Sequence, residues 1–121
     1  MTTTTGLVPA YLAAWNATDP ADRRDAIAAA FAPDVRYVDP LADVTGHAGL
    51  DALITGAHER FPGWVFTAVG DAETHHDVAR FAWSLGPAGA EPPVLGSDVV
   101  RLAPDGRIAE VLGFLDRVPA G

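Results

Sequence analysis

The chain has 121 residues, the length of one domain, and 49% of them are hydrophobic, which is enough for a buried core. Its 16 acidic residues outnumber the 8 basic ones and give a net charge of −8, so it lacks the basic surface that nucleic acids require and does not favour an anionic membrane. The absence of cysteine excludes disulfides, thiolate nucleophiles and zinc ribbons.

The N-terminal segment is polar and uncharged apart from its amine. Residues 1–5 are polar and are expected to form a disordered tail, with a single domain over residues 1–121. No long apolar run follows, which predicts a cytoplasmic protein with neither a signal peptide nor a membrane span. All eight basic residues are arginine, which we interpret as GC-rich coding and a bacterial source.

The first half of the chain has mainly helical periodicity. Apolar spacing predicts a helix over 7–16, and a second one that Asp19 caps, that Pro20 opens and that runs to about Phe31. A short strand over 35–39 follows, closed by Pro40, then a loop to Gly46 and a third helix over 47–61.

The second half has the alternating pattern of strands. We predict strands over 64–71, 78–85, 94–102 and 107–116, the last two joined by a turn at 104–106. In the second of these, Ala79, Phe81, Trp83 and Leu85 should face inward, with Arg80 and Ser84 outward. Helices followed by antiparallel strands indicate an α+β fold, with three N-terminal helices packed on a curved antiparallel sheet of four to six strands around a pocket.

Three polar residues lie at positions that the apolar periodicity of the chain predicts to be buried. Tyr11 lies on the apolar face of the first helix, Asp39 shares a strand face with Val35 and Tyr37, and Asp98 shares the parity of apolar neighbours in its strand. A buried carboxylate has a raised pKa, and two titratable groups whose environments push their pKa values apart typify acid–base sites.

These residues stand in segments that resemble the bacterial ketosteroid isomerases, within the SnoaL-like, nuclear-transport-factor-two-like superfamily. The matching segments are 11–19, 34–40, 97–102 and 105–108, within a resemblance that covers about residues 7–116. It implies a cone-shaped fold, an interior pocket and a homodimer. It also implies that Asp39 is a general base and that Tyr11 and Asp98 are oxyanion donors; Ile54 stands where those enzymes have a second, supporting tyrosine.

The expected function is cofactor-free acid–base catalysis on an apolar carbonyl compound, either double-bond isomerisation or a SnoaL-like cyclisation. The predicted pocket walls are Trp15, Phe31, His58, Phe66, Phe81, Trp83, Val100, Val111, Gly113 and Leu115. Alternatives are a non-catalytic small-molecule-binding domain, or a dimeric assembly module in which the pocket is vestigial, which a sealed and filled cone would favour. An apolar outer sheet face at Val65, Val69, Val99 and Leu112 should form the homodimer.

Simpler interpretations apply to the same residues. Asp39 can bond the amides of the loop after Pro40, and Asp98 can pair with Arg36 or Arg101. His58 is an alternative base, whereas His75 and His76 in a turn indicate solvated side chains. No metal-binding spacing or nucleotide-binding loop is present in the sequence, so no metal or cofactor is expected.

Overall fold

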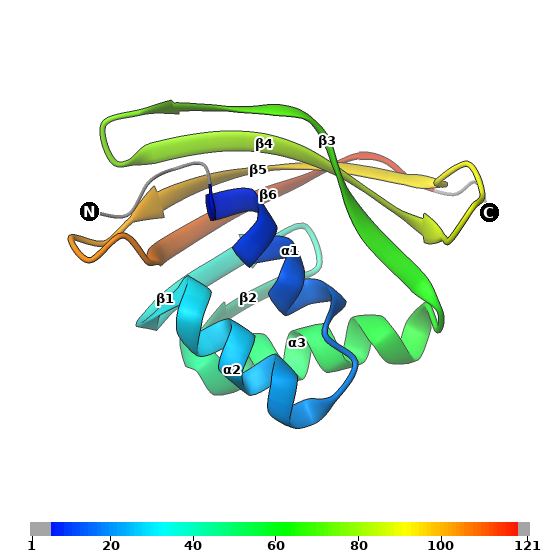
Figure 1. Cartoon of the computed structure of the whole chain (residues 1–121), viewed down its shortest axis with the longest axis horizontal. Helices are drawn as coiled ribbons and strands as arrows, with labels where there is room; N and C mark the ends of the chain where they lie inside the picture. Colours follow the sequence, from blue (N-terminus) through cyan, green and yellow to red (C-terminus); the bar gives the residue numbers. More distant parts are fainter. Residues whose placement is uncertain (1–5, 119–121) are drawn as a thin grey trace.

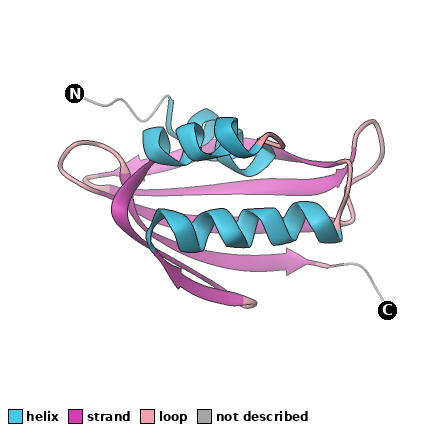
Figure 2. Cartoon of the chain, turned by 90° about the horizontal axis from the view of Figure 1, so that it is seen from below, coloured by secondary structure: helices cyan, strands magenta, loops and turns pink. Residues whose placement is uncertain are grey.

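A computed structural model describes residues 6–118, so the predicted tail over residues 1–5 lies outside the described residues. Helices α1 (Leu7–Asn16), α2 (Pro20–Ala30) and α3 (Gly46–Arg60) pack on one side of a curved sheet (Figure 1). Seen from below, they lie in front of the strands (Figure 2). No helix within residues 6–118 is both long and apolar enough to cross a membrane.

The sheet has six strands: β1 (Phe31–Asp39), β2 (Ala42–Thr45), β3 (Trp64–His75), β4 (Val78–Pro87), β5 (Val94–Leu102) and β6 (Ile108–Arg117). Their order is β2-β1-β6-β5-β4-β3, and every neighbouring pair is antiparallel except β1 and β6. The α+β fold is therefore confirmed, but the sheet is mixed rather than wholly antiparallel.

The first strand begins earlier than predicted. The second helix ends at Ala30, and Phe31 opens β1 although Pro33 follows. The strand accommodates this proline because its pairing with β6 is interrupted between Phe31 and Arg36, where no amide is required. The segment predicted as a loop to Gly46 contains β2, a four-residue strand too short to show alternation.

Local signals at the helix and hairpin ends were predicted well. The Asp19 side chain accepts the Asp22 amide at 3.0 Å, with Pro20 in the first turn of α2. Gly106 has a φ of 87° in the β5–β6 turn, a conformation that favours glycine.

The register prediction for β4 holds on its inner face. Ala79, Phe81, Trp83 and Leu85 are all buried, and Arg80 is exposed. Ser84 is buried too, contrary to prediction. It shares its strand face with Gly86, where a Cβ would lie 2.8 Å from Pro92 and Pro93, so the β4–β5 loop covers this end of the outer face.

Candidate functional site

The most buried acidic side chain of the fold is Asp98, on the inner face of β5. It is only 1% exposed. Its Oδ2 accepts two hydrogen bonds, from the Tyr11 hydroxyl of α1 at 2.6 Å and from the Trp83 indole of β4 at 3.1 Å. Arg36 and Arg101, the alternative partners predicted from the sequence, both contact Glu110 instead.

A glycine on β5 lets the Trp83 indole reach this carboxylate. Trp83 faces Gly96 across the β4–β5 pair, two residues before Asp98. A Cβ at position 96 would overlap the Trp83 ring, so the indole occupies the space that a side chain there would fill. Its N–H is thereby directed along the strand to Asp98.

The second carboxylate, Asp39, ends β1 and is only partly buried. Its Oδ1 accepts the amides of Leu41 at 2.8 Å and Ala42 at 2.9 Å, which is the turn that an Asp before Pro typically forms. Its Oδ2 accepts the Tyr37 hydroxyl at 2.7 Å. These three donors hold the carboxylate at the start of the β1–β2 turn.

The two carboxylates flank one glycine on the inner face of the sheet. Asp98 faces Gly113 across β5 and β6, and the β1–β6 register that pairs Val38 with Leu112 brings Asp39 to the other side of that glycine. A Cβ at position 113 would lie 2.7 Å from Asp98 Oδ1 and 3.3 Å from Asp39 Cβ. We call Asp39, Gly113 and Asp98 the carboxylate row.

Burial changes the pKa values of Asp98 and of the two tyrosines around this row. It raises the pKa of Asp98 to about 6, although the hydrogen bonds from Tyr11 and Trp83 act in the opposite direction. Burial, with the Asp98 charge beside both phenols, also raises the pKa of Tyr11 and that of Tyr37. Asp98 therefore changes protonation around pH 6, whereas the phenols stay protonated and can donate.

Two polar atoms in this interior have no hydrogen-bond partner within residues 6–118: Asp98 Oδ1 and Trp15 Nε1. A buried polar atom without a partner costs about 1–3 kcal/mol, so native proteins rarely keep one without a reason. The Trp15 indole also lowers the pKa of Tyr11, which places it close to that hydroxyl. Asp98 Oδ1 is therefore the oxygen of the Tyr11–Asp98 pair that is left to bond a guest molecule, whereas the Trp15 indole lies against the Tyr11 hydroxyl.

The aromatic members of the predicted pocket walls pack closely on Tyr11 and on one another. The Tyr11 ring contacts Phe81 at 5.0 Å and Phe31 at 5.7 Å between centroids. Phe66 contacts Trp15 at 5.2 Å and Trp83 at 5.5 Å. Phe31, Val100 and Val111 are fully buried, whereas Phe66, Gly113 and Leu115 are partly exposed.

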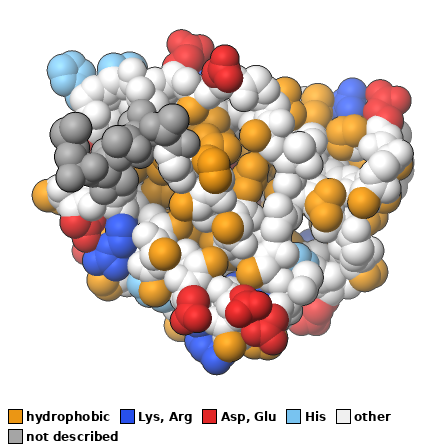
Figure 3. All heavy atoms as spheres, in the orientation of Figure 1, with side chains coloured by type: hydrophobic (Ala, Val, Ile, Leu, Met, Phe, Trp, Pro, Cys, Tyr) orange, Lys and Arg blue, Asp and Glu red, His pale blue; other side chains and the backbone are white. Residues whose placement is uncertain are grey.

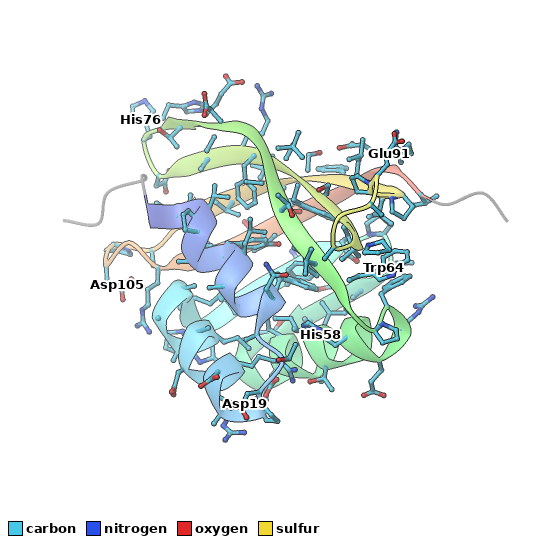
Figure 4. All side chains as sticks on the ribbon, turned by 45° about the vertical axis from the view of Figure 1, so that its right-hand side comes forward. Asp19, His58, Trp64, His76, Glu91 and Asp105 are labelled. Carbon is cyan, nitrogen blue, oxygen red and sulfur yellow. The ribbon has the colours of Figure 1, made fainter. Side chains whose placement is uncertain are left out.

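The histidines have structural or solvated positions. His58 Nε2 lies 2.7 Å from the Trp15 carbonyl, and since a carbonyl only accepts, that nitrogen carries the proton. His58 thus fastens α3 to the end of α1 (Figure 4). His75 is the last residue of β3 and His76 is the first of the β3–β4 turn; both are exposed. His76 lies at the end of the molecule away from Trp64 (Figure 4). No group of three or more His, Asp or Glu side chains in the described part of the chain could hold a metal ion.

Two surface grooves lie beside the row rather than over it. One, of about 370 Å³, runs between α1 and strands β3 and β4 with Phe81 in its lining, and the other, of about 360 Å³, lies between α1, the end of α2 and the β5–β6 turn. Neither is lined by Tyr11, Asp39 or Asp98. On the face shown in Figure 3, hydrophobic side chains gather in the middle and acidic ones lie mainly along the rim.

Sequence reasoning missed the polar roles of Tyr37 and Trp83. Tyr37 precedes Asp39 by two residues and so shares its strand face, and this spacing is the sequence signal for their hydrogen bond. Trp83 was predicted as an apolar wall; its N–H contact depends on the β4–β5 register and on Gly96, which a single sequence does not reveal.

Gly113→Ala should disturb the row directly. The new methyl group would meet Asp98 Oδ1 and push the carboxyl off its two donors, and we expect the free energy of unfolding to fall by about 1–3 kcal/mol. Gly56→Ala in α3 is the control, because nothing lies within 4 Å of its Cβ position; it should stabilise the helix by about 0.5–1 kcal/mol. Urea unfolding measures both, and equal effects of the two substitutions would contradict the tight packing at position 113.

The fold and the row together define a cone-shaped α+β domain with buried titratable groups at its centre. Residues 8–111 match the SnoaL-like domain family. The chain belongs to this family, as its sequence motifs predicted.

Solved structures agree with this assignment. A "putative isomerase of the SnoaL-like family" from Agrobacterium tumefaciens is 40% identical over 96% of this chain and 99% of its own, with a TM-score of 0.89. A "putative polyketide cyclase" from Sinorhizobium meliloti (20% identity, 88% and 92% coverage, TM-score 0.69) shares the fold. An NTF2-like protein from Exiguobacterium (18% identity, 91% and 98% coverage, TM-score 0.72) does so too. None of the curated proteins matches the chain.

Proposed function

We propose that this SnoaL-like protein is an acid–base enzyme that acts on an apolar carbonyl compound. The observation that carries the proposal is the carboxylate row, in which a hydrogen-bonded, partly exposed Asp39 and a buried Asp98 with a raised pKa lie on either side of Gly113. One carboxylate kept ionised can accept a proton, and the other, when neutral, can donate a hydrogen bond. The apolar side chains around the row favour a hydrophobic substrate.

In the proposed mechanism Asp39 removes a proton from the carbon next to the carbonyl. The negative charge that develops on the carbonyl oxygen is stabilised by a hydrogen bond from neutral Asp98, whose Oδ2 accepts the Tyr11 hydroxyl. Both side chains are buried. Returning the proton at another carbon isomerises a double bond, whereas attack of the enolate on a second carbonyl closes a ring. Both reactions share the first step and require no further group.

Substrate must enter from the side of the row that is accessible. Asp39 and Gly113 are partly exposed, whereas Asp98 and the rings of Tyr11 and Phe81 are buried. Since aromatic side chains close around Asp98, they must rotate or shift as the ligand binds. We therefore expect the association rate of the ligand to be below the diffusion limit. We also expect binding to restrict the motion of Phe66, the partly exposed ring between Trp15 and Trp83.

The experiment that tests this proposal offers the protein a steroid-like β,γ-unsaturated ketone and, separately, an open-chain polyketide ester. The absorbance of the conjugated ketone reports isomerisation. Cyclisation is reported by the disappearance of the open-chain compound and the appearance of a product of the same mass. Saturable conversion of either supports the proposal, and Tyr11→Phe should reduce it by about 10²-fold or more, because a hydrogen bond to the developing oxyanion is weakened. Conversion of neither at any protein concentration would overturn it.

A second candidate is a module that binds or assembles without catalysis. Two observations favour it: all three hydrogen bonds of Asp39 also suit a purely structural turn, and the two grooves are not lined by either carboxylate. The phenolic probe 2-naphthol separates the possibilities. Binding without conversion indicates a binding domain, and failure to bind indicates an assembly module.

We also propose that two copies associate through the outer face of the sheet. Val65 and Val69 on β3 and Leu112 and Phe114 on β6 are 39–57% exposed there, and Val99 faces Leu112 across β5 and β6. Contiguous exposed apolar side chains on a sheet face typically mark an interface.

Leu112→Asp should convert the protein from dimer to monomer, since it places a charge among the exposed apolar side chains of this face. Sedimentation velocity at micromolar concentration measures the change. Leu41→Asp is the matched control: Leu41 is 72% exposed but lies in the β1–β2 turn, and the dimer should persist. A wild-type protein that sediments as a monomer would refute the proposed interface.

A further inference from the structure

Two donors meet on the same oxygen of Asp98. The Tyr11 hydroxyl and the Trp83 indole both contact Oδ2, while Oδ1 has no partner within the described residues and lies against Gly113. An indole N–H can only donate, whereas a phenol can donate or accept. Trp83 therefore requires Oδ2 to be a hydrogen-bond acceptor. Tyr11 alone would not, because its hydroxyl could accept a hydrogen bond from Oδ2 instead.

This asymmetry decides where a neutral Asp98 carries its proton. A protonated carboxyl has one carbonyl oxygen and one hydroxyl oxygen, and the carbonyl oxygen is the better acceptor. Since Oδ2 accepts twice, the hydroxyl is Oδ1, on the side of the row that leads to Asp39. We propose that Trp83 is a positioning residue that places the Asp98 proton on Oδ1, where it can be donated to a ligand oxygen.

Without the indole, the hydrogen bond between Asp98 and Tyr11 can reverse. Asp98 would then donate from Oδ2 to the Tyr11 oxygen, and the proton would be lost to the ligand. Gly96 is required for the same arrangement, because any side chain at this position would displace the Trp83 ring from Asp98. The inference rests on the proposed function only for the ligand; the position of the proton is a property of the free protein.

Trp83→Phe tests the inference. Trp15→Phe is the matched control, since it also removes a buried indole, but one whose N–H makes no hydrogen bond to Asp98. The first readout is the pH titration of the Asp98 carboxyl by ¹³C NMR in the free protein. Loss of a donor to the carboxylate should move the Asp98 midpoint to higher pH in Trp83→Phe and leave it in place in Trp15→Phe. The charged and titratable groups that act on Asp98, namely Tyr11, Asp39 and Asp116, are the same in both variants.

The second readout is the affinity for 2-naphthol below the Asp98 midpoint, where Asp98 is neutral in each protein. Trp83→Phe should weaken binding about tenfold there despite its raised midpoint, because the proton points to Tyr11. When Tyr11 is replaced by Phe, the reversed hydrogen bond has no acceptor. The further substitution Trp83→Phe should then lower the affinity for 2-naphthol much less. This non-additivity separates proton placement from loss of packing, which would cost the same in both backgrounds.

An unmoved midpoint in Trp83→Phe, or equal losses of affinity in the two Tyr11 backgrounds, would overturn the inference. Failure of the proposed function gives a different pattern, in which the midpoint moves as expected but no ketone is converted. If Trp83→Phe does not fold, the indole N–H resonance of Trp83 in the wild-type protein decides. It should shift with the same midpoint as the Asp98 carboxyl, because the indole donates to Oδ2, and an indole resonance that does not respond would contradict the inference.

Discussion

Asp39→Asn should lower the turnover of a β,γ-unsaturated ketone by about 10²-fold or more, because an amide cannot take up the proton that the proposed mechanism removes. The amide oxygen can still accept the Leu41 and Ala42 amides, so the β1–β2 turn should keep its shape. The affinity for 2-naphthol should therefore change little. Steady-state kinetics and fluorescence titration measure the two effects separately.

Asp43→Asn is the control for this substitution. Asp43 lies on β2, also carries an acidic side chain and pairs with Arg36 at the surface. Its loss should leave both turnover and naphthol affinity unchanged. Equal activity of Asp39→Asn and Asp43→Asn would show that Asp39 serves only the turn.

The second large effect concerns Asp98 and the pH dependence of stability. Folding raises the pKa of this carboxyl from 3.8 to about 6. Below roughly pH 4 the folded and unfolded states both hold the proton; as the pH rises toward the folded pKa, only the unfolded state gives it up readily. Stability is therefore lost as the pH rises, by about 3 kcal/mol from this group.

Asp98→Asn should remove this pH dependence, because an amide stays neutral and its oxygen can still accept from Tyr11 and Trp83. The free energy of unfolding of the variant, relative to wild type, should rise by about 3 kcal/mol between roughly pH 4 and pH 7. Urea unfolding at several pH values measures the difference. A constant difference across that range would mean that Asp98 titrates normally.

The fold could be predicted largely from the sequence because its cues are local. The Asp19 cap, the turn at Gly106 and the alternation over 79–85 each depend on a few neighbouring residues. The parallel pairing of β1 with β6 could not be predicted from the sequence, since it joins strands about 75 residues apart and leaves no local pattern. The four-residue β2 was missed for lack of length.

In the site, too, local patterns could be predicted from the sequence, whereas contacts between distant residues could not. Strand parity placed Asp39 and Asp98 on the inner face, and the family resemblance selected Tyr11 as their companion. The hydrogen bond from Tyr11 to Asp98 spans 87 positions and requires the helix to pack on β5, which periodicity does not specify. The contact between Trp83 and Asp98 depends in addition on a missing side chain at position 96.

Exchange of the protons next to the carbonyl of an apolar ketone, followed by ¹H NMR in D₂O, tests the central claim most directly, because isomerisation and cyclisation both begin with that proton transfer. We predict a saturable loss of these signals with the wild-type protein and about 10²-fold slower loss with Asp39→Asn. The same slow exchange with wild type, with Asp39→Asn and without protein would contradict acid–base catalysis by this site.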